Sequence, residues 1–309
     1  MMTLTRYEFE LLSFLEHHGT KNYTIRDLSD SLCISGSWIS ACLDRMVEDG
    51  RIQRTAEGLS ITEAGLEALE PYRVKRALIV AAGFGSRMMP ATEDRPKPMV
   101  RVNGVRMIDT LLDALCAAGV RDITIVRGYC KEAFDELKDK YPFLSFVDND
   151  EYDTTNNISS TMKVLDLLEG GCWFCEADLY ITNPEIITKY QYTSNILGSW
   201  SLQTDDWSFR MKNGCVDEYQ KGNTFCWNYY GISYWTPEDC CKLREDFTEI
   251  WNTPGGKDWF WEFIPFVLKK DRYAVEIRQC RKQDIMEIDN YYELVQLDPS
   301  YGPGGDHAE

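Results

Sequence analysis

The stretch AAGFGSRMMPATEDRPKPMV, residues 81–100, carries residue types that hold and transfer phosphates. Gly83 and Gly85 follow the apolar run RALIVAAG, and a glycine turn after a strand lets backbone N–H groups approach phosphates. Arg87 follows two residues later, and Lys97 stands between two prolines whose restricted backbone angles fix its position. Two placed cations stabilise the charge that grows as pyrophosphate leaves a triphosphate, so the stretch predicts phosphoryl or nucleotidyl transfer.

Two familiar phosphate-binding patterns do not fit this spacing. The order is G-x-G-x-x-M, whereas a dinucleotide-binding turn has a third glycine in place of the methionine. The stretch also lacks the G-K-[ST] of a P-loop. The combination of A-A-G-x-G, S-R and R-P-K-P is better explained by a turn that cradles a triphosphate beside Arg87 and Lys97.

Strand and helix patterns alternate from Val74 onward and must position this turn. The apolar runs RALIVAAG, DITIVRGY and LSFVDND have the pattern of strands, and MIDTLLDALCAAGV and KEAFDELKDKY between them have the pattern of helices. This alternation predicts a Rossmann-like α/β domain over residues 74–309, with a doubly wound, mostly parallel sheet. Ligands bind such a sheet at the carboxyl ends of its strands, where the glycine turn lies.

Residues 1–73 have a different pattern, which predicts a small separate domain. Three helical segments precede RIQRTAEGLSIT, whose Glu57-Gly58 pair is a hairpin signal, and TEAGLEALEPY follows as a last helix. A capping box is expected between Thr24 and Asp27 in TIRD. This order of elements resembles the MarR-like winged helix-turn-helix family.

The charge of this N-terminal segment argues against DNA as a partner. Residues 1–75 contain 8 Lys or Arg against 12 Asp or Glu, and Arg45 is the only cation in the expected reading helix, SGSWISACLDRMVEDG. Phosphate contacts supply most of the affinity for duplex DNA, and only Arg51 and Arg54 in the hairpin favour it. We therefore expect a regulatory or dimerising module, with a homodimer as one outcome.

Composition indicates a soluble, cytoplasmic protein without a membrane partner. The net charge is −17 and the sequence pI is near 4.7, which repels nucleic acid and anionic lipid. No uninterrupted apolar run reaches the roughly 18 residues that a membrane span needs. The 11 cysteines are scattered, and Cys172 and Cys175 lie in an apolar strand-like run, so we expect buried thiols.

The stretch LIVAAGFGSRMMPATEDRPKPMVRVNGVRMID resembles the signature of nucleotidyltransferases of the nucleoside-diphosphate-sugar pyrophosphorylase type. Within that superfamily, residues 76–297 are most similar to bacterial choline-phosphate cytidylyltransferases, through DNDEYDTTNNISSTMKV, FCEADLYI, YYGISYWT, KDWFWEF and IMEIDNYYEL. The resemblance implies transfer of CMP from CTP to phosphocholine, with Lys97 and Arg87 as catalytic residues. It also implies a nucleotide site made of Ala82, Gly83, Gly85, Ser86, Gly128 and Tyr129.

Two acids that follow strand-like runs are the candidate metal ligands. Asp178 ends CWFCEAD and Asp289 ends RKQDIMEID, so both can lie at the same rim of the sheet. In the resembling family these positions carry Mg²⁺, which needs a few hard oxygen ligands besides the phosphates. Glu176 and Glu287, two residues earlier on the same strand face, could support them. The alternative is a pair of solvated strand-end acids.

Aromatic residues crowd the second half of the sequence and suit a cationic acceptor. A quaternary ammonium has no N–H to donate, so aromatic faces and nearby carboxylates recognise it. By resemblance, the substrate-binding residues are Asn156, Asn157, Tyr180, Trp207, Tyr230, Trp261 and Glu262. Lys221 is a further candidate phosphate-binding cation, and the alternative for each aromatic residue is an ordinary place in the core.

Two other functions are compatible with the sequence. A cytidylyltransferase for 2-aminoethylphosphonate or phosphoethanolamine would use carboxylates more than an aromatic cage, because a primary ammonium donates hydrogen bonds. A transcription regulator with a ligand-sensing transferase-like domain is the third hypothesis. Against it, a sensor has no need for Arg87, Lys97, Asp178 and Asp289 together.

Overall fold

The computed structural model describes residues 3–303 and divides the chain into two compact units. The first comprises Met1–Arg73 with Tyr190–Tyr192, and the second comprises Val74–Lys189 with Thr193–Glu309. Within residues 3–303, every helix is too short or too polar to cross a membrane.

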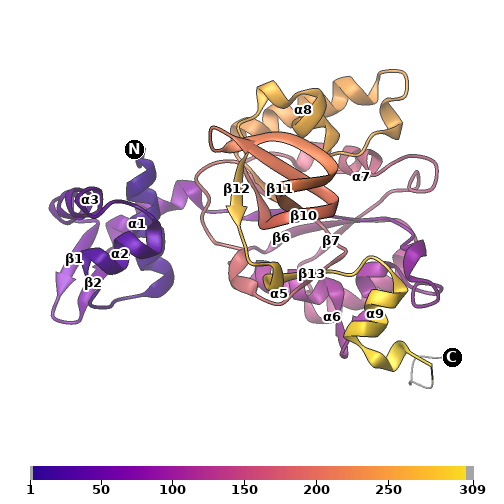
Figure 1. The fold of residues 1–309 in the computed structure, drawn as a ribbon, viewed down its shortest axis with the longest axis horizontal. Helices are drawn as coiled ribbons and strands as arrows, with labels where there is room; N and C mark the ends of the chain where they lie inside the picture. The colour runs from indigo at the N-terminus through magenta and orange to yellow at the C-terminus, as the bar shows by residue number, and fades with distance from the viewer. Residues whose placement is uncertain (1–2, 304–309) are drawn as a thin grey trace. The chain divides into compact units, whose positions relative to one another are not determined.

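The N-terminal unit contains three helices, a two-stranded hairpin and a fourth helix (Figure 1). They are α1 (Arg6–His18), α2 (Ile25–Leu32), α3 (Gly36–Glu48), β1 (Ile52–Thr55), β2 (Gly58–Ile61) and α4 (Glu63–Leu69). The expected capping box is confirmed, because Thr24 Oγ1 accepts from Asp27 N and the Asp27 carboxylate accepts from Thr24 N. The element order matches the expectation from the sequence, and membership of the winged-helix family stays a prediction.

Two of the cations expected to face DNA are already paired within this unit. Arg45 on α3 pairs with the buried carboxylate of Glu8, and Arg54 in the hairpin lies 2.9 Å from Asp44. An arginine held by a carboxylate would have to give up that partner to bind a phosphate. The ion pairs therefore add to the argument from net charge against tight DNA binding.

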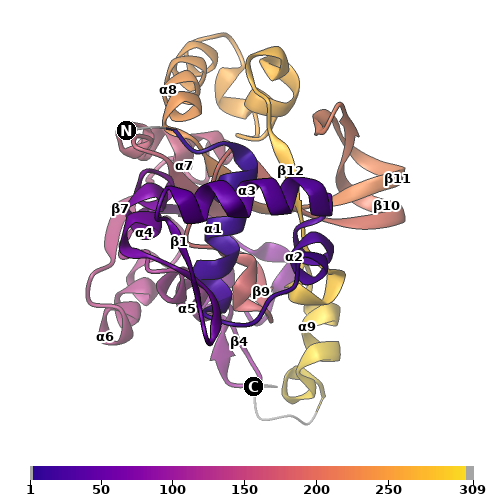
Figure 2. The same ribbon diagram turned by 90° about the vertical axis from the view of Figure 1, so that its left-hand side faces the viewer.

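A seven-stranded sheet forms the centre of the second unit, and the last four strands in the order below are parallel to one another. The strand order is β10 (Asn195–Lys212), β12 (Glu276–Gln279), β11 (Cys215–Trp235), β8 (Cys172–Glu176), β3 (Arg76–Ala81), β6 (Asp122–Arg127) and β7 (Ser145–Asp148). β11 runs antiparallel to β8, and it also pairs with β10 in a long hairpin that Figure 2 shows extending from the sheet. The mostly parallel α/β sheet agrees with the sequence prediction.

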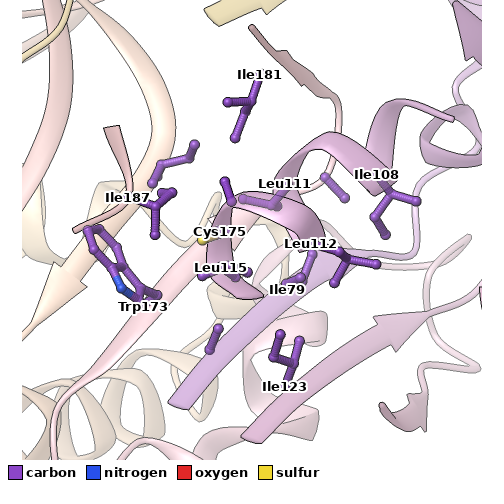
Figure 3. Close-up of a cluster of buried hydrophobic side chains, with 14 of the residues drawn as sticks. Ile79, Ile108, Leu111, Leu112, Leu115, Ile123, Trp173, Cys175, Ile181 and Ile187 are labelled. Carbon is purple, nitrogen blue, oxygen red and sulfur yellow. The ribbon is translucent and has the colours of Figure 1, made fainter. Parts of the chain in front are cut away.

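The two faces of this sheet pack against different helices, as the alternation along β3 requires. Ala77 and Ile79 lie in a cluster with Leu111 and Leu115 of α5 (Met107–Ala117), which Figure 3 shows at close range. Leu78 and Val80 point the other way, into a cluster that includes residues of α8 (Pro237–Trp251). Figure 1 shows α5 and α8 on opposite sides of the sheet. Burial on both faces explains why β3 is an unbroken apolar run.

Small elements at the rim complete the second unit. Their bounds are β4 (Arg101–Val102), β5 (Val105–Arg106), α6 (Leu137–Lys140), α7 (Ile158–Lys163), β9 (Leu179–Ile181), β13 (Ile285–Glu287) and α9 (Tyr291–Leu297). β13 pairs with β9 in a separate two-stranded sheet. The helix expected over residues 131–141 is mostly a 3₁₀ turn, Lys131–Glu136, followed by α6. Arg127 of β6 explains the difference, because its guanidinium binds Lys131 O and the Asp135 carboxylate and fixes the turn.

Candidate active site

A cavity of about 530 Å³ opens at the carboxyl ends of β3 and β8. The glycine turn after β3 lines it, as do the ends of β8 and β13, the β10–β11 hairpin and the segment before α7. This is the place that the doubly wound topology predicts for a ligand. The lining has two ends. We name the end with Arg87, Lys97, Asp178, Glu287 and Asp289 the phosphate-type end. We name the end with Glu176, Glu262, Trp207 and Phe260 the acceptor-type end.

The glycine turn and Lys97 are in direct contact. Gly85 has φ +62°, and a Cβ at this position would lie 2.7 Å from the Lys97 Cβ, so only glycine allows this approach. Thr92 closes the turn by donating from its hydroxyl to Gly85 O over 2.9 Å. Lys97 begins a 3₁₀ turn, Lys97–Met99, directly after the extended Pro96. The backbone therefore fixes both the turn and the base of the lysine side chain.

Four charged side chains from three parts of the sequence meet at the phosphate-type end. Lys97 Nζ lies 3.1 Å from Asp178 Oδ2 and 3.3 Å from Asp289 Oδ1, and Arg87 Nη1 lies 3.0 Å from Asp289 Oδ2. Burial alone would lower the pKa of Lys97, but the charges of Asp178 and Asp289 outweigh it and the pKa is raised. Lys97 is therefore a buried, charged ammonium, whereas the Arg87 side chain is 69% exposed and would have to leave Asp289 to contact a ligand.

Three carboxylates at this end form a cluster suited to a metal ion. Asp178, Glu287 and Asp289 offer oxygen atoms that all lie within 4.8 Å of one another. Glu287 lines the cavity, and the surrounding chain lies close around its carboxyl group. This burial, together with the charges of Asp178 and Asp289, raises the pKa of Glu287 to about 8. Crowded acids of this kind are the hard oxygen donors that a divalent cation prefers.

The acceptor-type end is built around Glu176 and Glu262. Glu176 Oε1 accepts from Tyr229 Oη at 3.2 Å and from Trp261 Nε1 at 3.0 Å, while Glu262 Oε2 accepts from Asn157 Nδ2 at 3.3 Å. Burial raises the pKa of both carboxyls, and for Glu176 the charge of Glu262 raises it further. A side-chain hydrogen bond also joins Glu176 and Glu262, so the two acids can share a proton, and a bound cation would favour their ionised forms.

A glycine on β11 makes room for one of these acids. A Cβ on Gly231 would lie 2.3 Å from Glu176 Oε2, so a larger residue would displace the carboxylate.

Aromatic rings form another wall of the same end. Trp207 on β10 and Phe260 both line the cavity, with ring centroids 6.4 Å apart. The acceptor-type end therefore combines carboxylates with aromatic faces.

Most of the residues expected to bind nucleotide or acceptor line this cavity. The lining includes Ala82, Gly83, Gly85, Ser86, Arg87, Lys97, Asn156, Asn157, Asp178, Trp207, Lys221, Glu262 and Asp289. Gly128 and Tyr129 lie behind the turn: Tyr129 N donates to Ala82 O over 3.1 Å, and a Cβ on Gly128 would lie 2.8 Å from the same oxygen. These two residues support the backbone of the turn.

Three residues expected to bind substrate are not among the residues that line this cavity: Tyr180, Tyr230 and Trp261. Tyr230 follows Tyr229 on β11, so it points to the opposite face of the sheet, where its hydroxyl bonds to Ser199 over 2.9 Å. Trp261 is 1% exposed and reaches the site only through its bond to Glu176. Tyr180 on β9 packs against an apolar cluster near α9.

Several lining residues were not singled out by sequence reasoning. They are Phe84, Asn149, Tyr152, Asp206, Tyr229 and Phe260. One of them could have been found by combining two signals in the sequence. Gly231 in an apolar strand is a mark of close approach by another group, and strand alternation counted from it places Tyr229 on the same face.

Comparison with known proteins identifies the second unit. Residues 77–190 match the MobA-like NTP transferase domain. A 2-aminoethylphosphonate cytidylyltransferase from Lancefieldella rimae is 36% identical over 230 residues, which cover 73% of this chain and 92% of that protein. A choline-phosphate cytidylyltransferase from Haemophilus influenzae is 28% identical and covers 71% and 96%.

A solved structure agrees with these sequence relatives. The CTP:phosphocholine cytidylyltransferase from Streptococcus pneumoniae superposes with a TM-score of 0.67 at 26% identity, over 74% of this chain and 98% of that one. The fold and the sequence relatives, which are enzymes, agree with each other. The chain belongs to the NTP-transferase family of cytidylyltransferases and is a nucleotidyltransferase.

Proposed function

We propose that this chain transfers CMP from CTP to 2-aminoethylphosphonate in the presence of Mg²⁺ and releases pyrophosphate. The observation that carries the choice of acceptor is the pair Glu176 and Glu262 in the cavity. A primary ammonium has three N–H donors for these carboxylates, whereas a quaternary ammonium has none. The relative from Lancefieldella rimae, which is named for this acceptor, supports the same choice.

The three-carboxylate cluster supports a divalent ion at the phosphate-type end. Asp178, Glu287 and Asp289 would hold it, since their oxygens converge and each carboxylate keeps lone pairs besides those facing Lys97 or Arg87. When bound, Mg²⁺ offsets the charge of the phosphates. Glu287 must lose its proton to serve as a ligand, because a protonated carboxyl is a poor donor to a metal.

The residues of the chain then account for binding and orientation. The backbone N–H groups of the turn at Gly83 and Gly85 receive the phosphates, and Lys97 places a fixed positive charge where charge develops. Arg87 closes on the departing pyrophosphate, and Lys221 across from Trp207 holds the phosphonate. A phosphonate oxygen forms the new bond to the α-phosphorus as the bond to pyrophosphate breaks. That oxygen is already anionic, so the step needs no general base.

Phosphocholine is the second candidate acceptor. Trp207 and Phe260 offer aromatic faces beside the same acids, which is the recognition that a quaternary ammonium requires. The relatives from Haemophilus influenzae and Streptococcus pneumoniae are named for this acceptor. The two candidates differ in whether carboxylate hydrogen bonds or ring faces supply most of the binding energy.

Stepwise N-methylation of the acceptor separates the two candidates. Purified protein is incubated with CTP, Mg²⁺ and 2-aminoethylphosphonate, or with phosphoethanolamine carrying zero to three N-methyl groups, and pyrophosphate release is measured. We expect the highest kcat/KM with 2-aminoethylphosphonate and a fall with each methyl group. A maximum at phosphocholine would select the second candidate, and no pyrophosphate with any acceptor would refute both.

A further inference from the structure

The segment that carries Glu262 is held in place by two adjacent asparagines. This segment, residues 253–263, follows α8 and brings both Phe260 and Glu262 to the cavity; we name it the acceptor strap. Asn156 N donates to Lys257 O over 3.0 Å, and Asn156 Nδ2 donates to Asp258 O over 3.1 Å. The strap is thus bound at its middle by a dipeptide about 100 residues earlier in the chain.

Asn157 binds the strap with both ends of its amide. Its Oδ1 accepts from Trp261 N at 2.8 Å, and its Nδ2 donates to Glu262 Oε2 at 3.3 Å. One side chain therefore fixes the backbone just before Glu262 and also orients the Glu262 carboxylate. Apolar and aliphatic residues cannot make this pair of contacts, because one requires an acceptor and the other a donor.

The beginning of the strap is also rigid. Gly255 has φ +76°, and a Cβ on Gly256 would lie 1.9 Å from Ile250 O, so this glycine is packed against the end of α8. Gly256 N donates to Thr253 O over 2.9 Å. With its start fixed by packing and its middle fixed by Asn156, the strap reaches Glu262 through backbone that Asn157 holds, and the Glu262 carboxyl is also hydrogen-bonded to Glu176 and Tyr229.

From these contacts we infer that Asn157 is a positioning residue that sets acceptor specificity by aiming Glu262 at the acceptor's ammonium group. The inference rests on the proposed function, because it requires an acceptor with an amine near Glu262. It assigns to Asn157 a role through Glu262, in place of the direct substrate contact suggested by sequence resemblance. Hydrogen bonds to charged groups are strong enough for this role to affect binding measurably.

The test compares an acceptor with an amine and one without. In the full chain, kcat/KM is measured for 2-aminoethylphosphonate and for ethylphosphonate, and their ratio reports recognition of the amine. We expect Asn157→Ala to lower this ratio about tenfold, while kcat/KM for ethylphosphonate and the KM for CTP stay near wild type. Asn157→Ser, whose short hydroxyl cannot bridge both partners, should behave likewise if the alanine variant folds poorly.

Asn183→Ala is the matched control. Asn183 Nδ2 donates to Asp284 Oδ1 over 3.3 Å across a similar sequence separation, and it lies outside the lining of the cavity. We expect this variant to lower the melting temperature and to leave the acceptor ratio unchanged. Equal losses of the ratio in both variants would show that Asn157 contributes only general stability.

A double-mutant cycle tests whether Asn157 acts through Glu262. Glu262→Gln should lower the acceptor ratio, and adding Asn157→Ala should lower it no further. Additive losses, or equal losses of kcat/KM with both acceptors in Asn157→Ala, would overturn the inference and leave the proposed function standing. A wild-type chain that does not prefer 2-aminoethylphosphonate over ethylphosphonate would refute the proposed function, and the inference with it.

Discussion

The two ends of the cavity are built in different ways. At the phosphate-type end, the turn at Gly83 and Gly85 and the cations Arg87 and Lys97 come from fewer than twenty consecutive residues. At the acceptor-type end, Asn157, Glu176, Tyr229 and Glu262 come from four separate segments. The turn and the two cations of the first end form a local motif, to which Asp178, Glu287 and Asp289 are added by the fold, whereas the second end exists only after the sheet and the acceptor strap have folded together.

This difference gives a physical basis for separating triphosphate binding from acceptor selectivity. A turn whose backbone angles are fixed by glycine and proline holds its shape whatever lies around it, so it suits the triphosphate that every such transfer needs. A site assembled from distant side chains changes when any one contact changes, so it suits an acceptor that differs between enzymes. We therefore expect variants at the two ends to have separable kinetic effects.

Lys97→Ala should have the largest effect. The variant removes a buried cation and leaves Asp178 and Asp289 without their shared partner, so kcat should fall by roughly a thousandfold, the upper range for one preorganised group. Steady-state pyrophosphate release at varied CTP and acceptor measures it, with circular dichroism to show that the fold is intact. A kcat within tenfold of wild type would remove Lys97 from the catalytic role.

Asp289→Asn should raise the Mg²⁺ concentration for half-maximal activity by on the order of 100-fold, because it removes one carboxylate of the three-carboxylate cluster. Arg87→Ala is its matched comparison, since it removes the ion-pair partner of Asp289 and keeps all three carboxylates. That variant should raise the KM for CTP and leave the Mg²⁺ requirement near wild type. If both variants shift the Mg²⁺ titration equally, the cluster is not a metal site.

Glu262→Gln should separate the two ends most clearly. The variant keeps the size and one acceptor oxygen but removes the negative charge that faces a cationic acceptor, so the acceptor KM should rise between about 10- and 100-fold. The KM for CTP should stay within about twofold. Equal increases in both KM values would mean that the two ends are not independent.

The sequence was sufficient for features fixed by local backbone geometry. The strand–turn junction at Gly83, the capping box at Thr24 and the alternation of strands and helices each depend on a few neighbouring residues. The meeting of Asp178 and Asp289 also followed from the sequence, because acids after strands of one unit tend to collect at one rim.

The acceptor-type end was harder to predict because side-chain direction on a strand depends on register. The sequence prediction named Tyr230, whereas the adjacent Tyr229 lines the cavity, because neighbouring residues on β11 point to opposite faces of the sheet. Trp261 and Asn157 were expected to touch substrate, yet the hydrogen bond of Trp261 holds Glu176, and Asn157, although it lines the cavity, holds the acceptor strap. Which groups pair across about 100 residues is decided by tertiary packing, which no local pattern encodes.

Tyr229→Phe and Tyr230→Phe should give the smallest effects and the finest test of that register. Tyr229→Phe removes the hydroxyl that donates to Glu176, so the acceptor KM should rise a few-fold. Tyr230→Phe removes a buried bond to Ser199 on the other face, so it should lower the free energy of unfolding by about 1 kcal/mol and leave both KM values unchanged. Urea unfolding and steady-state kinetics on the two variants measure both effects. The reverse pattern, with kinetics altered only in the Tyr230 variant, would place the opposite face of β11 in the site and invalidate the acceptor-type end as described.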